Sequence, residues 1–240
     1  MTAREAAREA WKNLKGRPLK EKLDHIWSYY RIPIIIGVFF IAMVCSIVIT
    51  SSGAKEAVLY GYCLNVSANT EAVDSVTQDF MKQAGIDPST QEVLLFSDLK
   101  TDKASAYDTM QALTVHIAAK EVDFILSDEQ TCLSMVQGGY YSDLKQVLNP
   151  QQQALLSPFY LYAERTALED DRDFEDPEKT PIVLASAEDL DDPVPVALQL
   201  PKTLFEGLYT FSGEGITLVI PPNAPHVDNL VKFLEFLMAR

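Results

Sequence analysis

An uninterrupted apolar segment constrains this chain more than any other feature. The run IPIIIGVFFIAMVCSIVIT, residues 32–50, is 19 residues long and contains no ionisable side chain. A helix rises about 1.5 Å per residue, so this length nearly matches a bilayer hydrocarbon core of about 30 Å. Trp27, Tyr29 and Tyr30 come just before the run, and such aromatic residues favour the membrane interface. The run therefore predicts a transmembrane helix.

The charges on the two sides of this segment predict its orientation. Residues 1–31 have a net charge of +4, whereas residues 32–240 have a net charge of −18. Basic flanks stay in the cytoplasm during insertion. We therefore expect a cytoplasmic basic leader at 1–31, a transmembrane helix at 32–50, a linker at 51–56 and an extracytoplasmic domain at 57–240. This organisation predicts a single-pass protein of the cell membrane.

Two other interpretations of the apolar segment are weaker. A cleaved signal peptide has an apolar core of about 7–15 residues, which is shorter than this run, and the 31-residue leader is long for one. A buried core helix does not explain the length of the run or its charged flanks. We therefore favour an uncleaved anchor.

The outer part of the chain alternates between strand and helix patterns. Apolar runs at 57–66, 92–96 and 122–126 predict strands, and amphipathic segments follow each of them. Asn69 and Asp102 are predicted to cap two of these helices, and Gly85 is predicted to end the first. Ser127 and Gln130 predict a capping box for the next helix. Further strands are predicted at 181–186, 194–200 and 216–222, before a C-terminal helix at 225–240. This alternation predicts an α/β domain with a mostly parallel sheet.

Two short motifs carry a resemblance to a known family. The strand DFIL, Asp123 to Leu126, is followed one helix later by a turn that contains Gly139, Tyr140, Asp143 and Leu144. These segments resemble the first lobe of the type II extracellular, or periplasmic, solute-binding proteins. The segment VPVALQLPKT, residues 194–203, is similar to the one in which that family's chain returns to its first lobe. Because 57–240 is short for two lobes, the resemblance implies a truncated solute-binding-like domain on an N-terminal anchor.

This resemblance implies a binding or sensing module that is not an enzyme. Its expected partners are the membrane, a small solute or peptide, and a membrane protein. The alternative is a structural or assembly subunit of a membrane complex that has no small-molecule ligand.

Polar residues at the ends of the predicted strands are the candidate ligand-binding residues. Ligands in open α/β sheets bind beyond the carboxyl ends of the strands. The residues at these ends are Asn65, Ser67, Ser97, Asp98, Ser127 and Asp128. An alternative explains part of this set without a ligand, because Ser127, Asp128 and Glu129 also suit the start of a helix.

The sequence contains no recognisable catalytic or cofactor motif. His25, His116 and His226 lie far apart, and neither a nucleophile elbow nor a phosphate-binding loop is present. We expect no cofactor and no metal. An acidic outer domain also argues against nucleic acid as a partner, because nucleic-acid binding needs a basic surface.

Three weaker signals leave alternatives open. Cys63 and Cys132 either form a disulfide near one edge of the sheet or are two separate buried thiols. The acidic loop 169–179 is not an EF-hand, because the twelfth position falls on Ile182, which is apolar. It is either a looser calcium site or a solvated loop. The glycosylation signal at residues 65–67 is short enough to arise by chance.

Overall fold

The chain divides into two compact units, Met1–Ala54 and Lys55–Arg240. We describe a computed structural model, which places residues 55–99, 106–170, 178–211 and 215–240 and six residues of the first unit. These six are helical and have 52% to 71% of their surface exposed: Ile32, Ile35, Ile36, Phe39, Phe40 and Met43. Most of the predicted span 32–50 lies outside the described residues, as does the predicted cap Asp102. Among the described residues, no helix is both long and apolar enough to cross a membrane.

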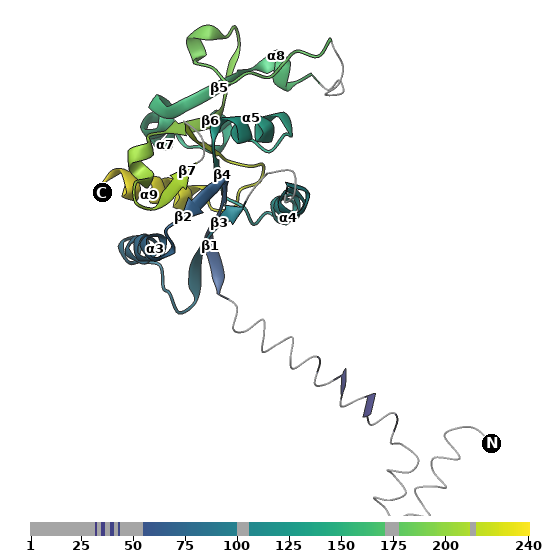
Figure 1. Cartoon of the computed structure of the whole chain (residues 1–240), viewed down its shortest axis with the longest axis vertical. Coiled ribbons are helices and arrows are strands. Elements are labelled where there is room, and N and C mark those ends of the chain that lie inside the picture. The colour runs from purple at the N-terminus through teal and green to yellow at the C-terminus, as the bar shows by residue number, and fades with distance from the viewer. Residues whose placement is uncertain are drawn as a thin grey trace, which may run out of the picture. The chain divides into compact units, whose positions relative to one another are not determined.

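The second unit contains helices and strands in alternation, followed by a more irregular half (Figure 1). Its strands are β1 (Glu56–Leu64), β2 (Val66–Ala68), β3 (Gln91–Leu99), β4 (Phe124–Ser127), β5 (Tyr160–Glu164), β6 (Pro193–Leu200), β7 (Tyr209–Phe211) and β8 (Ile216–Val219). Its α-helices are α3 (Thr70–Ala84), α4 (Ala106–Ala118), α5 (Glu129–Gln137), α6 (Leu144–Val147), α7 (Pro150–Leu156), α8 (Arg165–Leu168) and α9 (Val227–Met238). Its short 3-10 helices are Ser157–Phe159, Ala187–Asp189 and Lys202–Phe205.

A six-stranded sheet with the order β3-β1-β4-β8-β6-β5 forms the centre of this unit. β1 pairs in parallel with both β3 and β4, as expected for βαβ units. β8 pairs antiparallel with β4 and with β6, so β6 runs in the same direction as β4. β5 then pairs antiparallel with β6 at the far edge. The predicted α/β class is confirmed, and the sheet is mixed. β2 and β7 form a separate two-stranded sheet.

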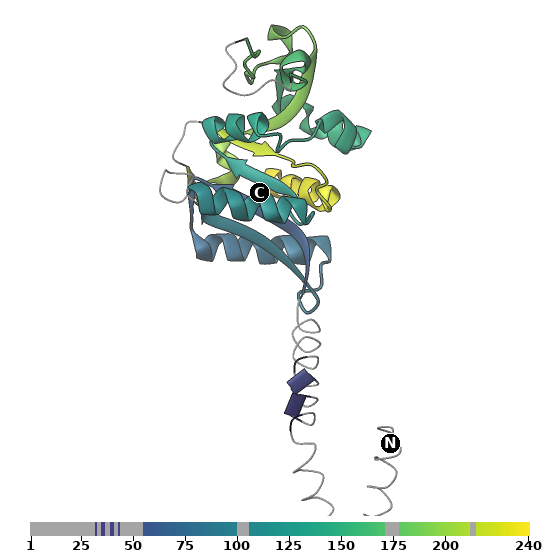
Figure 2. The ribbon, with the colours of Figure 1, turned by 90° about the vertical axis from the view of Figure 1, so that its right-hand side faces the viewer.

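Helices cover both faces of the sheet, which explains why the strands have nearly continuous apolar sequences. On β1, Leu59 and Cys63 pack with α3 and α9, whereas Tyr60, Tyr62 and Leu64 pack with α4 and α5. α3 and α4 lie on opposite sides of the strands in Figure 1. Figure 2 is seen from the side of α4 and α5, and these two helices lie in front of the strands.

The predicted ends of α3 are confirmed. The Asn69 side chain accepts a hydrogen bond from the backbone N–H of Ala72 at 3.4 Å, so it caps the helix. Gly85 ends the helix at a φ of 70°, in the left-handed region that favours glycine. The strand predicted at 181–186 is wrong, because this segment forms only an isolated bridge between Ala185 and Tyr162.

The two cysteines of the second unit are free and buried, so a disulfide between them is excluded. Cys63 packs in the core on the side of α3 and α9, whereas Cys132 packs in a separate core on the side of α5. Burial raises the pKa of each thiol to about 12. The strands that precede these two cysteines are nevertheless neighbours, because Cys63 of β1 pairs with Leu126 of β4.

β1 and β4 meet closely at Gly61. Gly61 pairs with Phe124, and a Cβ atom placed on Gly61 would overlap the ring of Phe124. The absence of a side chain at position 61 therefore makes room for this ring in the core, where Phe124 is almost fully buried.

A buried carboxylate joins three parts of the second unit. Asp123 is fully buried, and its Oδ2 accepts a hydrogen bond of 2.8 Å from the backbone N–H of Tyr60 in β1. Its Oδ1 accepts one of 2.6 Å from the backbone N–H of His226, at the start of α9, and the His226 Nδ1 lies 3.2 Å from Oδ2. Burial raises the pKa of the Asp123 carboxyl, although the hydrogen bonds from His226 and Tyr60 oppose that rise. Asp123 thus ties β1 and β4 to α9.

We predict that Asp123→Asn destabilises the protein by about 1–3 kcal/mol, because the new amide group cannot accept every hydrogen bond that the carboxylate accepts. The free energy of unfolding should be measured by denaturant titration. Asp79→Asn, on the exposed side of α3, is the matched control and should change stability little. Equal stabilities of the two variants would contradict the proposed role of Asp123.

Candidate functional site

Asn65 lies directly after β1 and contacts the start of α5. Its Nδ2 donates hydrogen bonds of 3.2 Å to Oδ2 of Asp128 and 2.8 Å to Oγ1 of Thr131. Its backbone has a φ of 57°, and its N–H donates to the carbonyl of Leu99 at 2.8 Å. Two predicted candidates, Asn65 and Asp128, are therefore in direct contact across the carboxyl ends of β1 and β4.

Asp128, and not Ser127, caps α5, so the predicted capping box is wrong. Oδ1 of Asp128 accepts a hydrogen bond of 2.9 Å from the backbone N–H of Thr131, and Oδ2 accepts one of 3.0 Å from its hydroxyl. Ser127 is instead the last residue of β4 and is fully buried. Position 127 thus belongs to the strand, and the helix begins one residue later than the sequence suggested.

Ser127 takes part in a junction between β4 and β8. Oγ1 of Thr217 donates to the backbone carbonyls of Ser127 at 3.1 Å and Asp128 at 3.2 Å, and Oγ of Ser127 donates to the carbonyl of Asp128 at 3.1 Å. Thr217 is also fully buried. These hydroxyl groups satisfy backbone carbonyls at the end of β4, which is a structural role.

The other three candidates do not join this network through any hydrogen bond of the described residues. Ser67 lies in β2 opposite Thr210 of β7 and is exposed. Ser97 and Asp98 lie near the end of β3, where the Ser97 hydroxyl donates to Asp98 at 3.4 Å. Asp98 is exposed and has a φ of 60°. The sequence missed Thr131 and Thr217, although Thr131 stands three residues after the cap, where a capping side chain finds its partner.

A separate pocket of about 510 Å³ lies at the opposite ends of the strands from Asn65 and Asp128. It forms between the turn after α5, helices α6 and α8, the start of β6, and the loop between β8 and α9. Because β8 is antiparallel to β4, its end lies beside the start of β4 and away from Asn65 and Asp128. The lining residues are Gly139, Tyr141, Ser142, Asp143, Gln146, Val147, Arg165, Leu168, Glu169, Val194, Pro222 and Asn223.

Local hydrogen bonds fix the walls of this pocket. Asp143 caps α6, and its oxygens accept from the backbone N–H of Lys145 at 2.9 Å and from Nε2 of Gln146 at 2.9 Å. The hydroxyl of Ser142 donates to the carbonyl of Pro221 at 3.0 Å, which ties the turn after α5 to the loop after β8. Gly139 has a φ of 77° in this turn. The backbone that surrounds the pocket is therefore held at both sides.

Charged and aromatic groups face each other at this site. Nε of Arg165 lies 2.7 Å from Oδ2 of Asp192, and Nη1 of Arg165 lies 3.9 Å from Oε1 of Glu169. The hydrogen bond to Asp192 raises the pKa of Arg165. Burial raises the pKa of the Tyr141 phenol, and the charges of Asp143 and Glu169 raise it further. Tyr141, Asp143 and Glu169 all line this pocket. Sequence reasoning missed this pocket because its walls come from segments far apart in the chain.

Among the described residues, no group of three or more His, Cys, Asp or Glu side chains could hold a metal ion. Residues 171–177 of the acidic loop lie outside the described part, so a calcium site there stays a hypothesis.

Comparisons with known proteins give little guidance. No family model matches the chain, and no curated protein matches it. One solved structure to which it is similar is an ABC substrate-binding protein from Listeria monocytogenes in complex with cycloalternan, at 17% identity and a TM-score of 0.27. The match covers 46% of this chain and spans 29% of that protein.

We predict that Asp128→Ala destabilises the protein by about 0.5–2 kcal/mol, because the first turn of α5 loses its cap and Asn65 loses a partner. Denaturant titration measures this loss. The matched control is Glu129→Ala, which removes a neighbouring carboxylate that does not cap the helix. A larger loss in the control than in Asp128→Ala would show that the cap is unimportant.

Proposed function

We propose that this chain is a membrane-anchored, extracytoplasmic binding module that is not an enzyme and has a solute-binding-like α/β unit. Its ligand occupies the pocket around Tyr141. The pocket carries the proposal, because about 510 Å³ is within the range of small-molecule sites and its walls combine apolar side chains with a few charged ones.

The positions of the polar groups also favour this pocket over the strand ends. At the strand ends, Asn65, Asp128 and Thr131 are hydrogen-bonded to one another, so a ligand would have to replace contacts that hold α5 in place. In the pocket, Tyr141 and Glu169 line open space. Binding by the predicted strand-end residues stays a hypothesis.

Two observations support the anchor. The run 32–50 has the length and lack of charge of a transmembrane helix, and the charge changes sign across it. The six described residues of this run are large and apolar, and each has more than half of its surface exposed. Exposed apolar side chains of this size are suited to contact with lipid.

Protease accessibility tests the predicted topology. In intact cells, added protease should digest the Lys55–Arg240 unit and spare an epitope tag placed before residue 1. The control for intact cells is a protease-sensitive cytoplasmic protein, which should stay uncut until the cells are lysed. A C-terminal tag that is protected in intact cells and cut only after lysis would show that the topology is wrong.

Thermal unfolding of the purified full-length chain tests the pocket. The chain should be screened against sugars, amino acids, polyamines and short peptides, since a ligand at 100 times its Kd adds about 2.7 kcal/mol to the free energy of unfolding. The rise in melting temperature should disappear in Tyr141→Ala and persist in Tyr107→Ala, which removes an exposed tyrosine on α4. An equal rise in both variants would place the ligand outside the pocket.

One observation favours the alternative of an assembly subunit. Helix α4 exposes Tyr107 and Val115, with 78% and 59% of their surface accessible. Exposed apolar side chains of this size on one helix suit a protein partner. The corresponding result would be co-purification of a membrane protein that is lost on Val115→Glu, with no small-molecule effect on the melting temperature.

A further inference from the structure

We infer that the pocket around Tyr141 binds a positively charged nitrogen group, an alkylammonium or guanidinium, between the Tyr141 ring and the carboxylates of Asp143 and Glu169. This inference rests on the proposed function, because it names the ligand class of the same site.

The balance of charge in the pocket favours a cation. Its acidic and basic lining residues are Asp143, Glu169 and Arg165. Arg165 contacts Asp192, which is not part of the lining, at 2.7 Å from Nε to Oδ2, and its Nη1 lies 3.9 Å from Oε1 of Glu169. The three carboxylates of Asp143, Glu169 and Asp192 together carry two more charges than the single guanidinium, so the pocket has an excess of negative charge.

An anionic ligand fits the pocket poorly. Its natural partner would be Arg165, but such a ligand would have to compete with Asp192 for the guanidinium and would approach two further carboxylates. Glu164 helps to hold Asp192 beside Arg165. Its carboxylate accepts hydrogen bonds of 2.9 and 3.0 Å from the backbone N–H groups of Asp191 and Asp192. The loop that presents Asp192 is thus fixed against β5.

Uncharged donors fix the carboxylate of Asp143 in position. These donors are the backbone N–H of Lys145 and the amide of Gln146. Each carboxylate oxygen has a second lone pair and can accept a further hydrogen bond. Asp143 therefore presents a carboxylate in a defined position beside the pocket.

Tyr141 supplies an aromatic surface next to these carboxylates. Tyr141, Asp143 and Glu169 line the same pocket, and the charges of the two carboxylates help to raise the pKa of the Tyr141 phenol. A cation over an aromatic face is attracted by the ring quadrupole, and nearby carboxylates add to that attraction. Ring and carboxylates together match an ammonium or guanidinium group better than they match a neutral sugar.

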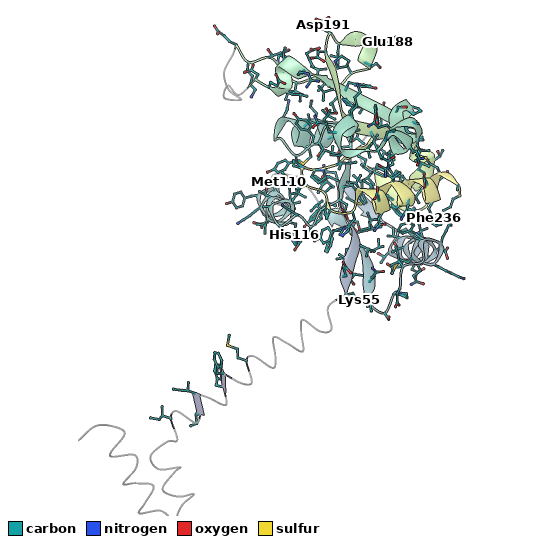
Figure 3. All side chains as sticks on the ribbon, turned by 180° about the vertical axis from the view of Figure 1, so that it is seen from behind. Lys55, Met110, His116, Glu188, Asp191 and Phe236 are labelled. Atoms are coloured by element: carbon teal, nitrogen blue, oxygen red, sulfur yellow. The ribbon has the colours of Figure 1, made fainter. Side chains whose placement is uncertain are left out.

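The surrounding surface would draw a cation toward this end of the unit. Glu188 and Asp191 lie together at the end of the unit far from Lys55 in Figure 3. Both side chains are exposed, and Asp192, the partner of Arg165, follows Asp191 directly. Surface charges of one sign raise the local concentration of oppositely charged ligands.

Calorimetric titration of the purified full-length chain tests the inference with three probes. Spermidine represents a free polyamine. The peptide acetyl-Gly-Arg-Gly-amide represents a basic side chain, and the same peptide with citrulline is its uncharged match. We expect spermidine or the arginine peptide to bind, the citrulline peptide to bind at least about tenfold more weakly, and the affinity to fall with added salt. If spermidine binds more tightly, the ligand is a free polyamine. If the arginine peptide binds more tightly, the ligand is a basic side chain of a peptide or protein.

Two matched variants assign the binding to the pocket. Glu169→Gln should weaken cation binding about fivefold or more, because it removes a carboxylate beside the cation. Glu188→Gln removes an equal charge from the same end of the unit, outside the lining, and should change the affinity less than about twofold. The Glu169 side chain is 69% exposed, so this substitution should leave the melting temperature of the free protein unchanged.

The outcomes separate this inference from the proposed function. If glucose or inorganic phosphate binds and Tyr141→Ala abolishes that binding, the pocket is a binding site and the cation class is wrong. If a cation binds and Glu169→Gln and Glu188→Gln weaken it equally, the cation binds the acidic surface and the inference is wrong. If none of the probes or screened solutes binds, both the inference and the proposed function fail.

Discussion

The buried carboxylate of Asp123 is the interaction on which the second unit depends most. An ionised group without water is costly unless hydrogen bonds replace its hydration. Here the donors come from β1 and from the start of α9, which are separated by more than 150 residues in the chain. The carboxylate is therefore satisfied only when the first strand, the third strand of the α/β alternation and the C-terminal helix are all in place. This requirement selects one arrangement of the chain over other compact ones, because hydrophobic burial alone has no direction.

Polar groups have different roles at the two ends of the strands. At the carboxyl ends of β1 and β4, Asn65 donates to the Asp128 side chain and Thr217 donates to backbone carbonyls, so the polar groups there hold secondary-structure elements together. At the opposite ends of these strands, Tyr141 and Glu169 line a pocket, and Glu169 lies 3.9 Å from Nη1 of Arg165. The polar residues at the carboxyl ends of β1 and β4 thus have a structural role. The pocket lies near the end of β8, which is antiparallel to β4.

Local sequence signals correctly predicted those parts of the fold that depend on interactions between residues close together in the chain. Asn69 and Gly85 bound α3 as expected, because a cap and a left-handed glycine act within one turn of a helix. Ser127 and Asp128 show the limit, since both residues suit a cap and only the pairing of β4 with β8, through Thr217, places Ser127 inside the strand. The same holds for Cys63 and Cys132, whose separation follows from which face of the sheet each one joins. The pocket could not be predicted from the sequence, because its lining residues Asp143, Arg165 and Asn223 come together only after the sheet has formed.

The close approach at Gly61 also has a consequence for how this protein can vary among its relatives. The ring of Phe124 occupies the space that a side chain at position 61 would need. A change from glycine is therefore compatible with the core only if a smaller residue replaces the phenylalanine in the neighbouring strand. In related sequences these two positions should covary, with glycine and a large ring exchanged together for a pair of intermediate size, so that the volume between β1 and β4 stays constant.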